Sequence, residues 1–273
     1  CIRDSDTMTH LTLLKESVEV KVGEKTLAKD QYTVTWDADS KTMDVAIMDV
    51  KAHGATTGTK VTVTYNATLD EDAVLGSMGN PNTADLEYSN NPNNTGDGTT
   101  KPEETGKTPE DKNIVFTYKV TANKVKENQQ PLEGAEFELF KKVGKESWIS
   151  KGKLTGTGDN QNVFEWKGLD DGDYKIVETK TPSGYNTIDP IEFTITAEHE
   201  IDSADPKLTS LSGGDVFTGN VTTGAVSANI VNKSGSTLPE TGGIGTTVFY
   251  VIGGMLMAAA AVLLITKKRM NNK

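Results

Sequence analysis

The sequence has almost no cysteine. Its one cysteine is Cys1, so no disulfide can form within these 273 residues, and a cross-link inside the chain needs another chemistry. Histidine is nearly as scarce. His10, His53 and His199 stand apart from one another and from the cysteine, which leaves a zinc site or a histidine-activated nucleophile without support. We expect neither a metal nor a cofactor.

The closest approach to a metal-binding pattern is an acidic stretch with Asp37, Asp39 and Asp44. Lys41 stands where a calcium loop needs a ligand, and Thr42 stands where it needs its turn glycine, so the stretch predicts a hairpin turn instead. The acidic run at 170–173 contains a glycine and precedes a strand-like segment, which predicts a solvated turn.

Basic residues are fewer than acidic ones, 28 against 39, and the formal net charge is −11. A surface with this excess of negative charge repels the phosphate backbone of nucleic acids. We therefore expect no nucleic-acid partner.

Long apolar runs are also lacking, with one exception near the C-terminus. Residues 248–265 contain no charge and are followed at once by TKKRMNNK. A membrane-spanning helix needs about 17–25 residues, and a basic cluster stays on the cytoplasmic side. Hydropathy alone leaves open a simple tail anchor, with the rest of the chain outside the cell.

Just before this run stand Leu238, Pro239, Glu240, Thr241 and Gly242. With the apolar run and the basic tail in this order, the segment resembles the LPxTG cell-wall sorting signal. The resemblance implies that a sortase cuts between the Thr and the Gly and joins the Thr to an amine of another pilin subunit or of peptidoglycan. The chain would then be a substrate and not an enzyme, anchored in the membrane only before sorting and covalently attached at the cell surface afterwards.

No run of the sequence before residue 248 keeps a helical period. Short alternating runs that are typical of strands flank a polar stretch rich in Asn, Gly, Thr and Pro, which predicts a linker; the runs read SVEVKV, YTVTW, MDVAIM, KVTVTYNA, VFTYKVTA, AEFELF, YKIVET and IEFTIT. We expect an all-β protein with tandem immunoglobulin-like β-sandwich domains. The predicted division is a domain over 1–92, a linker over 93–112, a domain over 113–235 and a sorting segment with one transmembrane helix over 236–273. With no signal peptide at its start, the chain is expected to be a fragment that lacks its N-terminal part.

Strand alternation puts three reactive side chains of the second domain on apolar faces. Lys124 is in phase with Tyr118, Val120 and Ala122; Glu178 is in phase with Tyr174 and Ile176; and Asn232 is in phase with Val226, Ala228 and Ile230. Any one such lysine is more often a snorkelling side chain at the rim of a sheet. Three coincidences favour a buried cluster.

Residues 114–233 resemble a Cna-B domain, the immunoglobulin-like module of Gram-positive pilins and adhesins. The resemblance rests on VTANKV, PLEGAEFELFKK, the E-box YKIVETKTPSGY and IVNKSGSTLPETGG. It implies a self-catalysed isopeptide bond between Lys124 and Asn232, with Glu178 as the acid. Burial favours a neutral amine beside a protonated acid. The amine can then attack the amide carbonyl while the acid bonds to that carbonyl and transfers protons until ammonia leaves.

Residues 1–92 resemble the C-terminal portion of the isopeptide-forming domain found second in fimbrial backbone subunits, on SDTM, QYTVTW, GTKVTVTYNATLDEDAVLG and GNPNTADLEYSNNP. The resemblance implies that Asn82 is the cross-linking amide and Asp6 the acid. A turn residue beside Pro81 is the alternative for Asn82. The strand that would carry the partner lysine is not in the sequence, and we expect this domain to lack its bond.

Together these features predict the backbone subunit of a sortase-assembled pilus. The main alternative is a wall-anchored adhesin or minor pilin that uses the same domains beneath a ligand-binding head, with a host surface ligand as its partner. A wall-anchored enzyme whose catalytic domain lies elsewhere is a third possibility, which no residue of the sequence supports.

Overall fold

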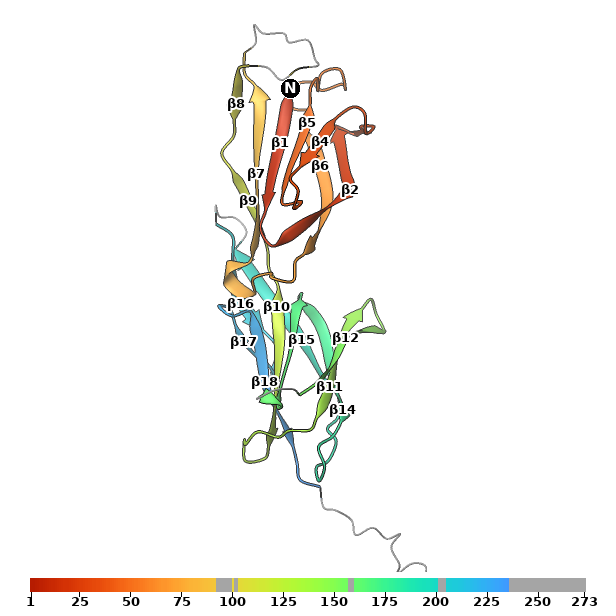
Figure 1. Cartoon of the computed structure of the whole chain (residues 1–273), viewed down its shortest axis with the longest axis vertical. Coiled ribbons are helices and arrows are strands. Elements are labelled where there is room, and N and C mark those ends of the chain that lie inside the picture. Colours follow the sequence, from red (N-terminus) through yellow and green to blue (C-terminus); the bar gives the residue numbers. More distant parts are fainter. Residues whose placement is uncertain (92–99, 101–102, 157–159, 201–204, 236–273) are drawn as a thin grey trace, which may run out of the picture.

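The computed structural model describes residues 1–91, 100, 103–156, 160–200 and 205–235. Two groups of strands follow one another along the length of the molecule (Figure 1). The sorting motif at 238–242 and the apolar run at 248–265 lie outside the described residues. Within the ranges that are described, no helix is long and apolar enough to cross a membrane.

The first group of strands forms two sheets whose pairings are all antiparallel. The 6-stranded sheet has the order β4-β5-β1-β7-β8, with β9 also paired to β7; its strands are β1 (Ile2–Met8), β4 (Thr33–Trp36), β5 (Thr42–Ile47), β7 (Asn80–Ser89), β8 (Thr105–Lys107) and β9 (Asp111–Val115). The 3-stranded sheet has the order β3-β2-β6 and consists of β2 (Leu11–Val22), β3 (Lys25–Thr26) and β6 (Val61–Leu69).

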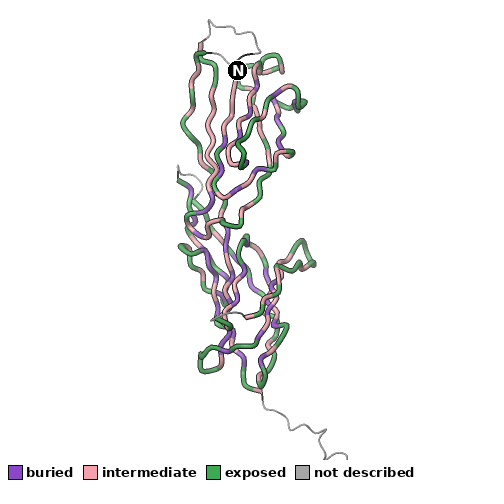
Figure 2. Tube along the Cα trace, viewed as in Figure 1, coloured by how far each residue is buried: buried purple, intermediate pink, exposed green. Residues whose placement is uncertain are grey.

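The core of the first group follows from the alternation of its strands. In β5, Met43, Val45 and Ile47 are buried while the residues between them are partly exposed, because successive side chains of a strand point to opposite faces. Val20 and Val22 of β2 pack against the same core. Figure 2 marks the buried residues along these strands in purple.

β8 and the first two residues of β9 lie inside the segment that the sequence predicts to be a linker. β8 pairs with the C-terminal end of β7, from Glu87 to Ser89, and β9 pairs with its N-terminal half, from Asn80 to Ala84. The predicted linker over 93–112 is therefore wrong at its C-terminal end. The physical reason is that pairing at a sheet edge uses backbone groups, which a polar sequence supplies as well as an apolar one does.

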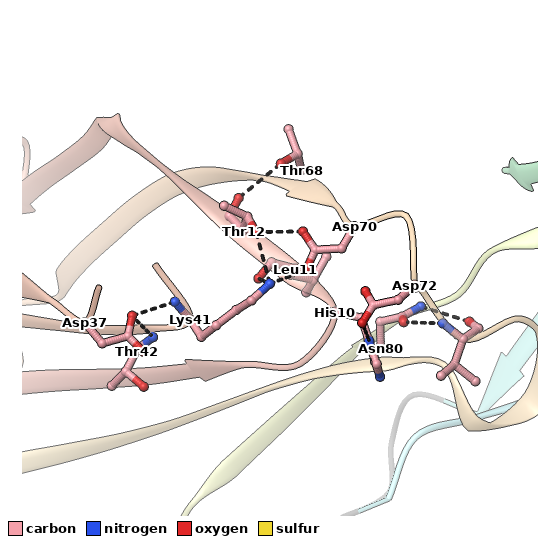
Figure 3. A network of polar contacts seen from close by, with 11 residues as sticks. His10, Leu11, Thr12, Asp37, Lys41, Thr42, Thr68, Asp70, Asp72 and Asn80 are labelled. Carbon is pink, nitrogen blue, oxygen red and sulfur yellow. Dashed lines mark hydrogen bonds and ion pairs between the residues drawn. The ribbon is translucent and has the colours of Figure 1, made fainter. Parts of the chain in front are cut away.

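An ion pair joins the ends of the two sheets in the first group. The ammonium of Lys41 donates hydrogen bonds to the carboxylate of Asp70 and to the Thr12 hydroxyl at 3.0 Å, and the same hydroxyl donates to Asp70 at 2.6 Å (Figure 3). These hydrogen bonds favour the charged carboxylate and lower the pKa of Asp70. The contact links the β4–β5 turn to the chain that follows β6.

The second group of strands also forms two sheets. The 4-stranded sheet has the order β13-β10-β18-β17 and consists of β10 (Tyr118–Lys126), β13 (Val163–Leu169), β17 (Thr218–Asn220) and β18 (Ala225–Asn232). The 5-stranded sheet has the order β12-β11-β14-β15-β16 and consists of β11 (Glu136–Val143), β12 (Ser147–Thr155), β14 (Gly172–Lys180), β15 (Ile191–Glu200) and β16 (Lys207–Ser212). The predicted all-β fold class is confirmed.

β10 and β18 are parallel neighbours in the second group, with Lys119 opposite Ala225 and Lys126 opposite Asn232. They are separated in sequence by the whole of the group's other strands. Parallel pairing of this kind closes the fold between its first and last strands.

The two groups meet where a short 3₁₀ turn, η1 (Gly76–Met78), contacts the β17–β18 turn. The Ser77 amide donates to the Val221 carbonyl at 2.9 Å. Gly76 and Gly224 lie backbone to backbone: a Cβ added at Gly224 would stand 2.4 Å from the Gly76 nitrogen. Only glycine permits this approach at either position.

Candidate functional site

Lys124, Glu178 and Asn232 meet in the interior of the second group. Lys124 and Asn232 have an exposed fraction of 0% and Glu178 of 6%. They come from three strands: β10 and β18 of one sheet and β14 of the facing sheet. The structure thus brings together the three side chains that strand alternation selects.

A chain of hydrogen bonds runs from Lys124 through Asn232 to Glu178. The ammonium of Lys124 donates to Oδ1 of Asn232, and Nδ2 of Asn232 donates to Oε1 and Oε2 of Glu178 at 2.9 and 3.2 Å. Nζ of Lys124 lies 3.4 Å from Oε1 of Glu178. The mechanism expected from the sequence has the acid in contact with the amide carbonyl, whereas in the structure Glu178 contacts the amide nitrogen of Asn232.

The environment of Lys124 favours its neutral form. Desolvation by burial lowers the pKa of the amine, and the neighbouring Glu178 carboxylate opposes part of this effect. The ring of Phe137 lies 5.4 Å from Nζ. A nucleophilic amine, an amide carbonyl and a proton carrier are therefore held within contact distance in a site without solvent.

The first group holds a second polar cluster, formed by Asp6, Tyr65 and Asn82. The Tyr65 hydroxyl donates to Oδ1 of Asp6 at 2.7 Å, and Nδ2 of Asn82 donates to that oxygen at 3.0 Å and to the Tyr65 oxygen at 2.7 Å. Desolvation and the contact with Asp6 raise the pKa of Tyr65. Sequence reasoning names Asp6 and Asn82 but misses the tyrosine.

Asn82 lies within β7, opposite Met8 of β1 and Asn113 of β9. The alternative prediction of Asn82 as a turn residue is therefore wrong, since β7 runs from Asn80 to Ser89. Proline has no backbone N–H to donate. In its contact with Thr9, Pro81 only has to accept, since the Thr9 amide donates to the Pro81 carbonyl at 2.8 Å.

Two buried oxygens of this cluster, Oδ2 of Asp6 and Oδ1 of Asn82, have no hydrogen-bond partner among the described residues. A cleft of about 310 Å³ opens beside them. β6 and β9 border it, and each has a partner on one side only in the described part of the sheets; its lining consists of Met8, Leu11, Tyr65, Ala67, Leu69, Asn82, Asn113 and Val115. The cluster thus carries unused acceptors next to open space.

The other sequence candidates have structural roles. Oδ1 of Asp37 accepts hydrogen bonds from the backbone amides of Lys41 and Thr42 at 2.7 and 3.1 Å, as a hairpin turn requires. Asp170 accepts from the Tyr174 hydroxyl at 3.0 Å. No group of three or more metal-ligating side chains occurs in the described ranges.

Three family models match separate parts of the chain. Residues 2–92 match the Cna-B-like domain of Gram-positive pilin backbone subunit 2, residues 118–207 match a prealbumin-like fold domain, and residues 230–272 match the LPXTG cell wall anchor motif. The chain thus matches, one after the other, a domain model of Gram-positive pilin backbone subunits, a prealbumin-like fold domain and a cell wall anchor motif. As the anchor motif indicates, it is a cell-wall-anchored surface protein.

Known relatives agree with this assignment. The trypsin-resistant surface T6 protein of Streptococcus pyogenes serotype M6 is 35% identical over 130 residues, which cover 45% of this chain and 23% of that protein. The match thus spans less than a quarter of the length of this curated relative. The solved T6 backbone pilin of the same organism has a TM-score of 0.56 at 22% identity, over 86% of this chain and 61% of that one.

A 35 kDa C-terminal fragment of a major pilin of Streptococcus agalactiae has a similar fold, with a TM-score of 0.58 at 22% identity over 85% of this chain and 86% of that one. The group B streptococcus pilus 2b backbone protein gives 0.57 at 22% identity over 88% and 87%. At these identities the likeness concerns the fold. It supports the arrangement of two β groups in tandem.

Proposed function

We propose that this chain is a structural subunit of a surface pilus, joined covalently through Thr241 after a sortase cuts before Gly242. Its partners are the sortase and, as the covalent acceptor, another pilin subunit or peptidoglycan. The pilin backbone match at 2–92 and the anchor match at 230–272 support the proposal. The chain acts as a substrate of the sorting enzyme and as a load-bearing element, and not as a catalyst of turnover.

We further propose that Lys124 and Asn232 form an isopeptide bond with Glu178 as the acid. The observation that carries this proposal is the buried contact of all three side chains. In the reaction the neutral amine attacks Cγ of Asn232, and the amide nitrogen takes up protons and leaves as ammonia. Fixed neighbours in a folded core supply an effective concentration on the order of 10⁵ M or more, which a slow amide exchange requires.

The intact mass of the purified chain tests this bond. We expect the mass to be lower than the sum of the residues by one ammonia, with Lys124 and Asn232 in one cross-linked peptide after digestion. A chain that keeps its full mass when folded would contradict the proposal.

For the first domain we infer a second site of the same kind, in which Asn82 is the amide that reacts with a lysine amine and Asp6 is the acid. The unpartnered oxygens and the adjoining cleft support this inference. Pilin extracted from cells should then show one ammonia loss fewer when Asn82 is replaced by Ala. An unchanged count would refute the first-domain site and leave the second untouched.

Immunoblots of wall extracts boiled in detergent test the assembly. A ladder of high-mass bands is expected for a polymerised backbone subunit. One discrete band would instead support the alternative, an adhesin or minor pilin that is anchored singly.

A further inference from the structure

The loop at residues 181–188 holds both Glu178 and the end of the strand that carries Asn232. The Asn186 amide donates to the Lys233 carbonyl at 3.0 Å, and the Gly235 amide donates to the Gly184 carbonyl at 2.9 Å. Tyr185 and Ser234 form a bridge between these two hydrogen bonds. The loop is therefore tied to the residues that directly follow Asn232.

The same loop occupies one oxygen of the Glu178 carboxyl group. The Thr181 hydroxyl donates to Oε2 at 3.1 Å, and the Ile188 amide donates to Oε2 at 3.2 Å. Oε1 receives neither of these donors. Nζ of Lys124 lies 3.4 Å from Oε1, and Nδ2 of Asn232 lies closer to Oε1, at 2.9 Å, than to Oε2, at 3.2 Å.

The direction of the Thr181 hydrogen bond is set by its neighbours. Oε2 accepts a hydrogen bond from the Ile188 N–H and acts as an acceptor toward Thr181 as well, so the Thr181 hydroxyl is the donor in this contact. The Thr181 oxygen then accepts from the Thr187 hydroxyl, which lies 2.7 Å away. This gives a short relay from Thr187 through Thr181 to Glu178.

A proton on Oε2 would meet the Ile188 N–H and the Thr181 O–H, which both donate there, whereas a proton on Oε1 can be donated to the neutral amine of Lys124. We propose that Thr181 is a positioning residue for the Lys124–Asn232 condensation: with the Ile188 amide it reserves Oε2, so that the proton of Glu178 resides on Oε1, which faces the reacting groups. The proposal rests on the isopeptide bond proposed above and names a residue that directs it.

The proton count of the reaction shows why this placement matters. Lys124 first gives one proton to Oε1, and the lone pair of its neutral amine forms the bond to Cγ of Asn232. When the new C–N bond forms, the amine nitrogen loses a second proton. As the bond from Cγ to Nδ2 breaks, Nδ2 takes one proton and leaves as ammonia, while the other proton remains on Glu178 or follows as ammonium. Every transfer passes between Oε1 and an atom that it already faces.

Three variants of the full chain, kept soluble in mild detergent, test the role of Thr181. Thr181→Val removes the hydroxyl at nearly constant volume, and Thr181→Ser restores it. Thr209→Val is the matched control, because the Thr209 hydroxyl donates to the Glu198 carbonyl at an exposed position away from the site. Each chain is made in a cell-free system, and intact-mass spectrometry follows the loss of ammonia with time between pH 5 and pH 9.

We expect wild type, Thr181→Ser and Thr209→Val to react at similar rates. Thr181→Val should react more slowly by on the order of 10-fold or more, with a displaced pH profile, because positioned proton transfer contributes at least this much. Equal rates and pH profiles for Thr181→Val and Thr209→Val would overturn the proposal, and so would a serine variant as slow as the valine one. Circular dichroism of each unreacted chain verifies that it has folded.

The outcomes distinguish the positioning role of Thr181 from the isopeptide bond on which it rests. A wild-type chain that never loses ammonia refutes the isopeptide bond itself, and the positioning role with it. A wild-type chain that reacts normally beside an unaffected Thr181→Val refutes the positioning role alone.

Discussion

The ammonium of Lys124 donates a hydrogen bond to the side-chain carbonyl of Asn232, although 108 positions separate the two residues in the sequence. The pairing of β10 with β18 makes this contact, since Lys126 lies opposite Asn232 in the parallel register. The two side chains are therefore brought together only when the fold is complete. If the proposed bond forms by this route, its presence will report a correctly folded domain.

The first prediction concerns Glu178. Glu178→Gln keeps the size and much of the hydrogen bonding of the side chain but cannot carry the proton, so we expect the chain to keep its ammonia. Without the covalent loop the free energy of unfolding should fall by about 4–5 kcal/mol, by analogy with a disulfide that closes a loop of about 100 residues. Intact mass and urea denaturation measure the two effects. Glu192→Gln, at an exposed position on β15, should change neither.

The second prediction concerns Asp70 in the contact of Figure 3. Its pKa is lowered in the folded state by the hydrogen bonds from Lys41 and Thr12, so its contribution to stability is present above the unfolded pKa and disappears as the pH falls through the folded value. Asp70→Asn should lower the melting temperature at pH 7 and have less effect with each step into acid. A difference from wild type that stays constant down to about pH 2 would contradict this.

The third prediction concerns Asp4, whose pKa is raised in the folded state and not lowered like that of Asp70. Burial and the nearby Asp6 and Asp85 raise the pKa of Asp4 to about 6, so the folded state binds a proton more tightly than the unfolded chain does. Stability is then lost as the pH rises from the unfolded value toward 6. Asp4→Asn should raise the melting temperature at pH 7 and leave it nearly unchanged at pH 4. A variant that is less stable than wild type at pH 7 would show that the charged form of Asp4 has a partner.

The fourth prediction concerns the junction between the two groups of strands. Gly224→Ala places a Cβ against the backbone of Gly76 at a φ of +62°, so it should separate η1 from the β17–β18 turn and loosen the angle between the groups. Small-angle scattering should show a broader distribution of lengths. Gly214→Ala is the control, because its φ is +72° and nothing lies within 4 Å of the added atom. The control should cost similar backbone strain without altering the shape.

Much of this architecture can be read from the sequence because strand alternation is a strong signal. The runs around Val20, Val45 and Ile176 form buried strands as their period predicts. The same period places Lys124, Glu178 and Asn232 on inner faces. It cannot say which strands are neighbours, and the parallel register of β10 and β18 is visible only in the fold.

The parts that the sequence does not predict depend on backbone contacts or on single side chains. β8 and β9 pair through main-chain groups, which leave no pattern in a polar stretch. Tyr65 has the same period as an ordinary core aromatic of β6, and its hydroxyl contacts appear only with the facing β1 and β7. The contact of the Ile188 amide with Glu178 belongs to a loop, where no periodicity exists.

The parallel arrangement of β10 and β18 also decides how the second domain would respond to a force that pulls its two ends apart. The chain enters at the start of β10 and leaves at the end of β18, so a stretching force shears the whole ladder at once instead of unzipping it pair by pair. With the proposed bond between Lys124 and Asn232 in place, the force would cross from one strand to the other at that point. The residues between these two, which make up most of the domain, would then carry no tension, and the short stretch from Tyr118 to Lys124 would bear the load.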